Sequence, residues 1–362
     1  MNRWIAFVAG LLLAMPAFSL SVTFINPGKS DEAYWVAVAE SMKAAAESLG
    51  IALEMRFVER DHPQMLAVAQ EIANRPKAER PDYVILTNDY DLGPKQLSIL
   101  ESSGIRCFFA FSPPSAAERQ EVGMPRKRYM NWIGSLQPHA ADAGYLTAKS
   151  LIAKGRTAKV QGPDGKLHLL AIAGDRSTTV SVERNEGMRR AVSEAGDVVL
   201  DQVVFADWSR DKAAEQSAVL FGRYPSARLI WAGSDQMAFG AMQSWEKRGG
   251  KPGEDAWFSG VNTSREAMEA IKSGRLTALA GGHFITGAWA LVMIYDYANG
   301  RDFRDEGLEL DRPMFTLFDA QSADRYLSRF GSGYSKIDFR RYSKVLNPQI
   351  KRYNFSFEQL MR

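Results

Sequence analysis

Hydrophobic positions along the chain follow two periods in turn, one typical of strands and one typical of helices. Residues 22–26 (VTFIN) form a short β-branched run that predicts a strand, and residues 34–50 have the apolar spacing of an amphipathic helix. The alternation continues through the first third of the chain. Further strands are expected at residues 52–59, 81–89 and 105–111, and further helices at residues 63–75 and 95–104.

The same pattern begins again after residues 131–155. Strands are expected at residues 166–174, 198–207, 227–233, 255–261 and 276–282, and helices at residues 181–196, 211–224, 235–249, 264–274 and 287–300. Repeated strand–helix units specify a parallel sheet with helices on both faces. The chain is therefore expected to be an α/β protein with two doubly wound parallel-sheet lobes.

The pattern changes from residue 301 onwards. A strand-like run at residues 312–320 is followed by a basic and aromatic C-terminal extension at residues 336–362. The aromatic rings of this extension predict that it packs against the rest of the chain, because disordered tails have few such residues.

Polar and aromatic segments follow three of the strands in the first lobe, at residues 26–35, 87–93 and 111–115. Ligands of parallel sheets bind beyond the carboxyl ends of the strands. These three segments are therefore expected to surround one crevice.

The first nineteen residues, 1–19, have the features of a cleaved signal peptide. Arg3 supplies the positive start, an apolar run follows, and Ala17 and Ser19 are the small residues that a signal peptidase recognises. Cleavage after Ser19 predicts secretion into a bacterial periplasm; the alternative is an uncleaved membrane anchor. No other segment stays apolar for about 18 residues, so the mature protein is expected to be soluble.

Charge and cysteine content exclude further classes of protein. The formal net charge is only +3 and no arginine-rich arm occurs, so no nucleic acid partner is expected. Cys107 is the only cysteine and lies in an apolar run. It is therefore expected to be a buried thiol, and no internal disulfide is possible.

Motifs for enzymatic chemistry are missing from the sequence. The "GKS" at Gly28 resembles the end of a phosphate-binding P-loop, but Thr23 replaces the required first glycine and Pro27 removes an amide donor. No G-x-S-x-G elbow occurs, and the four histidines lack the H-x-x-x-H spacing of a metal site. We therefore expect no enzyme activity, no cofactor and no bound metal.

Aromatic residues gather beside hydrogen-bonding residues at the predicted strand ends. Tyr34 and Trp35 follow the acidic "SDEA", Phe111 precedes "SPPS", and Trp208 lies in "FADWSRD". Flat rings beside polar groups suit a small polar ligand with apolar faces, such as a sugar. The alternative for each ring is that it only covers the core.

Three stretches of the second lobe carry a resemblance to a known family. They are residues 183–192 (ERNEGMRRAV), 227–242 (ARLIWAGSDQMAFGAM) and 258–278 (FSGVNTSREAMEAIKSGRLTA). On these stretches the chain resembles the type I periplasmic binding proteins, in particular the ribose/galactose-like branch that binds sugars. The resemblance covers roughly residues 22–301. Repressors of this family begin with a helix-turn-helix, whereas this chain begins with a signal peptide.

The resemblance implies two lobes that close on a ligand about a hinge of three chain crossings. The crossings are expected near residues 131–138, 281–286 and 308–314. The N-terminal lobe would comprise residues 20–133 and 284–310, the C-terminal lobe residues 134–283 and 311–335, and the extension residues 336–362.

The resemblance also implies ligand-binding residues. The family's sugar contacts correspond by position to Tyr34, Trp35, Trp208, Ser234, Asp235, Asn262 and either Gly282 or His283. A family Asp-Arg pair is replaced by Phe111 and Ser112, and a family arginine by Val182, so a less charged and more aromatic site is expected. The remaining polar contacts are expected from Ser112, Asn262, His283 and the acidic residues Asp31, Glu32 or Asp89.

Two points stay open in the sequence. Asp31 and Glu32 either touch the ligand or only cap the first helix. Glu183 and Arg184 are interpreted as an ion pair at a helix start rather than as ligand contacts.

Two functions are compatible with this resemblance. The first is a monomeric solute-binding protein that presents a sugar-like ligand to the inner-membrane permease of an ABC importer. The alternative is a ligand receptor that docks on the periplasmic domain of a sensor histidine kinase, cyclase or chemoreceptor, as autoinducer-2-binding proteins of this fold do. The replaced arginines and the extension at residues 336–362 favour the alternative somewhat.

Overall fold

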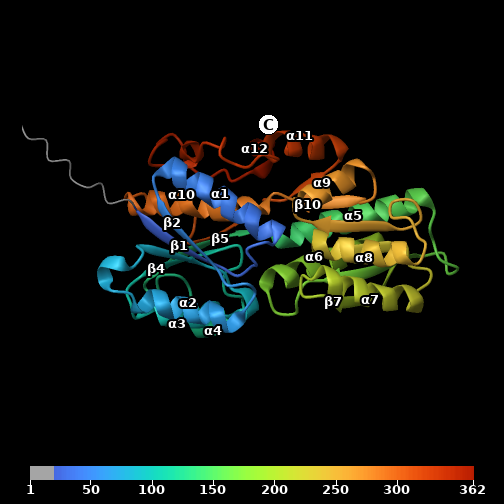
Figure 1. Ribbon diagram of the computed structural model, residues 1–362, viewed down its shortest axis with the longest axis horizontal. Coiled ribbons are helices and arrows are strands. Elements are labelled where there is room, and N and C mark those ends of the chain that lie inside the picture. The colour runs from blue at the N-terminus through green and yellow to red at the C-terminus, as the bar shows by residue number, and fades with distance from the viewer. Residues whose placement is uncertain (1–19) are drawn as a thin grey trace, which may run out of the picture.

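Two six-stranded sheets, each covered by helices on both faces, organise the chain into two lobes (Figure 1). The computed structural model describes residues 20–362, so the predicted signal peptide at residues 1–19 lies outside the described residues. Each sheet follows the doubly wound order, which confirms the fold class predicted from the sequence. Within residues 20–362, no helix is both long enough and apolar enough to cross a bilayer.

The first sheet is parallel throughout and has the strand order β11-β5-β4-β3-β1-β2. Its strands are β1 (Ser21–Asn26), β2 (Ala52–Phe57), β3 (Tyr83–Leu86), β4 (Arg106–Ala110), β5 (Trp132–Pro138) and β11 (Glu309–Arg312). Its helices are α1 (Ala33–Leu49), α2 (His62–Asn74), α3 (Gly93–Glu101), α4 (Arg119–Val122) and α10 (Thr286–Ala298), with 3-10 turns at η1 (Lys77–Glu79) and η2 (Asp89–Asp91).

Alternate residues of the central strands bury opposite faces of this sheet. Phe24 and Phe108 face the core formed with α1 and α10, whereas Ile25 and Phe109 face the core formed with α2 and α3. Successive strand residues point to opposite faces, so a strand covered on both sides is apolar throughout. This is why the strands read as continuous hydrophobic runs in the sequence.

The second sheet has the strand order β12-β10-β9-β8-β6-β7. Its strands are β6 (Leu167–Ala173), β7 (Val198–Phe205), β8 (Leu229–Ala232), β9 (Trp257–Val261), β10 (Ala278–Gly281) and β12 (Thr316–Phe318). Its helices are α5 (Ala140–Ala158), α6 (Thr179–Ala195), α7 (Arg210–Arg223), α8 (Asp235–Lys247), α9 (Arg265–Lys272) and α11 (Ala320–Phe330). The edge strand β12 pairs antiparallel with β10, because the chain enters it directly from the first lobe.

Three crossings join the lobes: they follow β5, which ends at Pro138, β10, which ends at Gly281, and β11, which ends at Arg312. The predicted lobe boundary at residue 133 falls inside β5, which pairs with β4 and β11. Hydrogen bonding therefore keeps the whole strand, through Pro138, in the first sheet. The second crossing contains the short 3-10 turn η3 (His283–Ile285).

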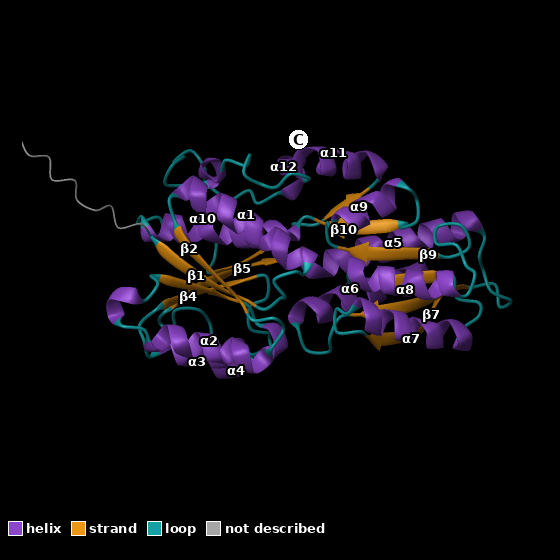
Figure 2. Cartoon of the chain, viewed as in Figure 1, coloured by secondary structure: helices purple, strands orange, loops and turns teal. Residues whose placement is uncertain are grey.

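The C-terminal extension packs against the lobes, as its aromatic residues predict. It contains the 3-10 turn η4 (Phe339–Tyr342) and ends in the short helix α12 (Phe357–Met361). Figure 2 shows it as a loop-rich layer above α1 and α10 and beside α11. Four of its rings are buried: Phe339, Tyr353, Phe355 and Phe357.

Helices α5 and α6 approach closely at two glycines. A Cβ atom on Gly144 would lie 1.8 Å from the carbonyl oxygen of Arg184, and one on Gly187 would lie 1.9 Å from that of Ala141. Only residues without a side chain allow this contact. The pair of glycines therefore sets the position of α6, which carries Arg184.

We expect Gly144→Ala to lower the free energy of unfolding by about 1–3 kcal/mol, because the added methyl forces the two helices apart. Gly222→Ala is the matched control, since Gly222 is an exposed position in α7 with no atom within 4 Å of the added Cβ. The control is expected to be neutral or to stabilise by up to about 1 kcal/mol. Chemical denaturation of both variants measures the difference, and equal midpoints would contradict this account of the α5–α6 contact.

Candidate functional site

A cavity lies between the lobes, where the carboxyl ends of both sheets face each other. Its volume is about 70 Å³, and both lobes and the second crossing contribute to its wall. The lining residues are Glu32, Tyr34, Trp35, Arg60, Asp89, Phe111, Ser112, Pro138, Thr178, Val180, Arg184, Trp208, Ser234, Asp235, Gln236, Asn262 and His283.

Three rings of the first lobe form an aromatic wall. Trp35 packs edge-to-face against both Tyr34 and Phe111, with ring centroids 4.9 and 5.5 Å apart. Tyr34 and Trp35 come from the first turn of α1, and Phe111 follows β4 with a positive φ of 71°. A Cβ atom on Gly28 would lie 1.8 Å from the Trp35 ring, so the loop before α1 must have glycine there.

Trp208 forms the aromatic side of the second lobe. Its indole Nε1 donates to Oδ2 of Asp175 at 2.7 Å, and Oδ1 of Asp175 accepts the backbone N–H of Thr178 at 2.6 Å. The ring lies over Gly174, where a Cβ atom would come within 2.3 Å of it. Each tryptophan of the cavity is thus seated on a glycine in its own lobe.

Arg184 and His283 meet at the hinge side of the cavity. Nη2 of Arg184 lies 3.0 Å from Nε2 of His283, and Nη1 donates to the carbonyl oxygen of Gly233 at 2.7 Å. Burial and the neighbouring guanidinium lower the pKa of His283 well below its usual range, and burial lowers the pKa of Arg184 to about 10. His283 is therefore neutral, and because arginine only donates, Nε2 accepts and Nδ1 carries the proton.

The ring of His283 also connects the two lobes by stacking. Tyr34 of α1 stacks on it with centroids 4.8 Å apart, and Phe315 of the third crossing lies 4.5 Å away. One side chain of the second crossing therefore contacts the first lobe, the second lobe through Arg184, and the third crossing.

Asp235 and Asn262 supply polar groups from the second lobe. Nδ2 of Asn262 donates to Oδ1 of Asp235 at 2.9 Å, while Oδ2 of Asp235 has no hydrogen-bond partner among the described residues. Burial raises the pKa of Asp235. Asn262 has a φ of 112°, and Ser234 caps α8 by accepting the backbone N–H of Met237.

The first lobe also contributes charged groups to the cavity wall. Arg60 donates to both carboxylate oxygens of Glu32. Asp89 is held by the hydroxyl of Ser112 at 3.4 Å. Burial raises the pKa of Asp89 to about 7; the Arg60 cation opposes the rise, and the carboxylates of Asp175 and Glu32 add to it.

Ten of the eleven residues predicted for the site line this cavity. They are Tyr34, Trp35, Asp89, Phe111, Ser112, Trp208, Ser234, Asp235, Asn262 and His283. Asp31 does not: it is exposed and precedes the first turn of α1, so its side chain lies outside the cavity. Glu32, the next residue, lines the cavity in its place.

Six lining residues were missed or misinterpreted in the sequence, namely Arg60, Pro138, Thr178, Val180, Arg184 and Gln236, and two of them are charged. Arg184 does not pair with Glu183 at a helix start; it lies in the second turn of α6 and reaches Gly233 and His283. Arg60 gave no motif at all, because its position depends on a loop after β2 and on Glu32. The one available signal was helical spacing, which places Val180 and Arg184 on the same face of α6.

Metal ligands are not grouped in the part of the chain that the structure describes. Residues 20–362 contain no cluster of three or more His, Cys, Asp or Glu side chains that could hold a metal ion. The cavity combines aromatic rings with hydrogen-bonding groups, an arrangement that suits a small polar ligand.

Comparison with known proteins gives a consistent family. Residues 22–302 match the family profile described as periplasmic binding protein domain. A periplasmic sugar-binding protein from Pseudomonas fluorescens is 36% identical, with a TM-score of 0.86 over 95% of this chain and 100% of that chain. The ribose import binding protein of Salmonella typhimurium is 30% identical over 146 residues, 40% of this chain and 46% of the relative. The match thus spans about half the length of that curated relative.

More distant structures share the fold. An ABC transporter periplasmic solute-binding protein from Actinobacillus succinogenes with bound D-allose has a TM-score of 0.72 at 18% identity, over 84% of this chain and 99% of that chain. The family profile covers most of the chain, and the relatives from Pseudomonas fluorescens and Salmonella typhimurium are both binding proteins. The chain is therefore a binding protein rather than an enzyme, and it belongs to the periplasmic binding protein family.

Proposed function

We propose that this chain is a periplasmic solute-binding protein that encloses a small sugar-like ligand between its lobes and presents it to an ABC importer. The observation that carries the proposal is the cavity between the lobes, which both sheets line with rings and hydrogen-bonding groups. The protein acts as a monomer, and the signal peptide at residues 1–19 directs it to the periplasm.

The chemistry of the cavity favours a ligand with apolar faces and many hydroxyl groups. Trp35 and Trp208 come from opposite lobes and offer flat surfaces for the faces of a sugar ring. Asp89 and Asp235 are acceptors that hydroxyl groups can satisfy, and Arg184 is a donor. Hydrogen bonds to these charged groups are stronger than bonds between neutral groups.

Relatives support the sugar assignment and the transport role. The Pseudomonas fluorescens relative is a sugar-binding protein, and the Salmonella typhimurium relative is a ribose import binding protein. Structural neighbours bind D-allose or myo-inositol. These ligands share a compact ring that carries several hydroxyl groups.

A second candidate function is a receptor that docks on the periplasmic domain of a sensor histidine kinase, cyclase or chemoreceptor. The observation that favours it is the extension at residues 336–362, where six of the seven Lys or Arg residues are exposed, against two Asp or Glu. Such a surface offers a partner contact beyond those of a transport subunit. Neighbouring permease and ATPase genes would favour import, and a neighbouring sensor gene would favour signalling.

The proposed binding function is tested by a thermal-shift screen of the mature protein. D-Ribose, D-allose, L-arabinose, D-galactose and myo-inositol are the first probes, followed by nucleosides and small signal molecules. A bound ligand is expected to raise the melting temperature with concentration, because it binds the folded state alone. If only nucleosides or amino acids shift the melting temperature, the sugar assignment is wrong.

We expect Trp35→Ala and Trp208→Ala each to weaken binding of the identified sugar more than tenfold, the usual effect of losing a buried aromatic anchor. Trp208→Phe is the matched control, because it keeps a ring but removes the bond from Nε1 to Asp175. Calorimetry should rank the control between the alanine variant and the unchanged protein. Equal affinities for all four proteins would remove these rings from the site.

The affinity for that sugar is expected to rise about tenfold between pH 6 and pH 8. The pKa of Asp89 is raised to about 7 in the free protein. Sugar hydroxyls that donate to the ionised carboxylate favour deprotonation, so the sugar binds more weakly below pH 7. Calorimetry of Asp89→Asn should show a flat profile, and a wild-type affinity that falls with rising pH would contradict this role.

A further inference from the structure

The last thirty residues of the chain follow an unexpected path between the lobes. Residues 331–361, named here the strap, leave α11 in the second lobe, run along α1 and α10 of the first lobe, and return to α11 (Figure 1). The start is fixed in the second lobe, where Arg265 donates to the carbonyl oxygen of Gly331 at 3.0 Å. The chain therefore crosses between the lobes two more times than the three-crossing hinge requires.

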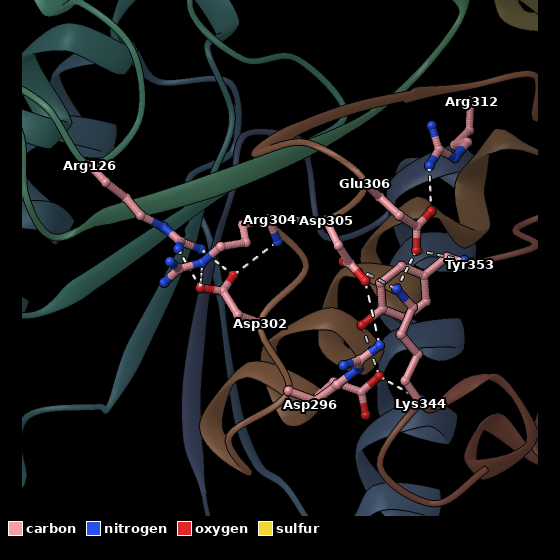
Figure 3. Close-up of polar contacts among 10 residues, drawn as sticks. Arg126, Asp296, Asp302, Arg304, Asp305, Glu306, Arg312, Lys344 and Tyr353 are labelled. Atoms are coloured by element: carbon pink, nitrogen blue, oxygen red, sulfur yellow. Dashed lines mark hydrogen bonds and ion pairs between the residues drawn. The ribbon is translucent and has the colours of Figure 1, made fainter. Parts of the chain in front are cut away.

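The middle of the strap is bound to the first lobe through Asp296 of α10, which is fully buried. Its carboxylate accepts the hydroxyl of Ser343. It also accepts the backbone N–H of Lys344 at 2.7 Å and the hydroxyl of Tyr353 at 2.9 Å (Figure 3). A buried carboxylate that satisfies several donors makes a rigid attachment, because breaking it leaves each group without a partner.

A second buried carboxylate connects the strap to the hinge. Glu306 forms an ion pair with the buried ammonium of Lys344 and accepts the backbone N–H of Tyr353 at 2.9 Å. Its other oxygen accepts Nη2 of Arg312 at 2.9 Å, in the last residue of β11 (Figure 3). The third crossing starts at Arg312, so the strap is joined to the point where the chain leaves the first lobe.

The end of the strap is bound to the second lobe by aromatic contacts. Phe357 lies 6.2 Å from the rings of both Tyr326 and Phe330 in α11, and 6.3 Å from Phe318 in β12. It also covers Gly282 of the second crossing, where a Cβ atom would lie 2.5 Å from the Phe357 ring. Gly282 directly precedes His283, which lines the cavity.

Only one residue separates the two attachments at this end. Phe355 stacks on Trp289 of α10 with centroids 5.1 Å apart, and Phe357 contacts the second lobe. Two residues of extended chain span at most about 7 Å. Separation of α10 from α11 therefore requires that either the Trp289 contact or the Phe357 contact breaks.

We propose that the strap is a conformational restraint on the hinge, which holds the lobes in the present arrangement, where both line one cavity, and yields by release of α12. The two attachments of the strap differ in kind. The first-lobe attachment is a buried ionic network, whereas the second-lobe attachment is a five-residue helix held by Phe357, Leu360 and Met361. The shorter attachment gives way first when the lobes open. This proposal depends on neither the ligand nor the membrane partner.

The test measures the distance between the lobes in the ligand-free mature protein. Spin labels at the exposed positions Lys95→Cys, in the first turn of α3, and Asp211→Cys, in the first turn of α7, report the distance between the lobes by pulsed electron paramagnetic resonance. Cys107 is buried and stays unlabelled. The unchanged strap should give one narrow distance distribution, and removal of residues 357–362 should add a population at longer distance.

Phe357→Ala weakens the same second-lobe attachment without shortening the chain. It decides the outcome if circular dichroism shows that the truncated chain does not fold. Leu346→Ala is the matched control, since Leu346 lies in the strap between its attachments and is 43% exposed. The control should keep the narrow distribution. A broad distance distribution in the protein with an intact strap overturns the proposal. An unchanged distance distribution in the truncated chain or in Phe357→Ala also overturns it, even if the melting temperature falls.

Discussion

The contact of His283 with both lobes is the interaction on which the candidate site depends. Tyr34 stacks on the imidazole from the first lobe, and Arg184 donates to it from the second. The ring is neutral because it is buried beside a cation, so it can accept this bond. The aromatic wall of one lobe and the polar groups of the other share a cavity only while the second crossing holds this ring between them.

Backbone with positive φ at the strand ends directs three other side chains of the site into that cavity. Phe111, Trp208 and Asn262 all have positive φ values of 71°, 62° and 112°. Such a conformation costs a residue other than glycine about 1–3 kcal/mol and persists only where the surroundings determine it. Here the surroundings are the ends of packed parallel strands, whose side chains would otherwise continue along the sheet rather than turn into the cleft.

The strap adds a further restraint at the hinge. Ordinary closure requires only that three crossings bend, whereas this chain also has a buried ionic attachment on α10 and an aromatic attachment on α11. Both attachments reach the crossings, through Arg312 and Gly282. Motion of the lobes is therefore linked to a segment in which seven Lys or Arg residues stand against two Asp or Glu, at residues 336–362.

The sequence by itself determined the two lobes and the order of strands and helices, because strands buried on both faces are continuous apolar runs. It also determined which strand ends carry the candidate site, because ligands of parallel sheets bind beyond the carboxyl ends of the strands. Tyr34, Trp35, Asp89 and Trp208 could be predicted for that reason. Only the tertiary structure decided that Arg184 reaches His283, that Asp31 faces away, and that the strap returns to the second lobe. Those outcomes depend on helix rotation and on contacts between residues up to 99 positions apart, which no local pattern specifies.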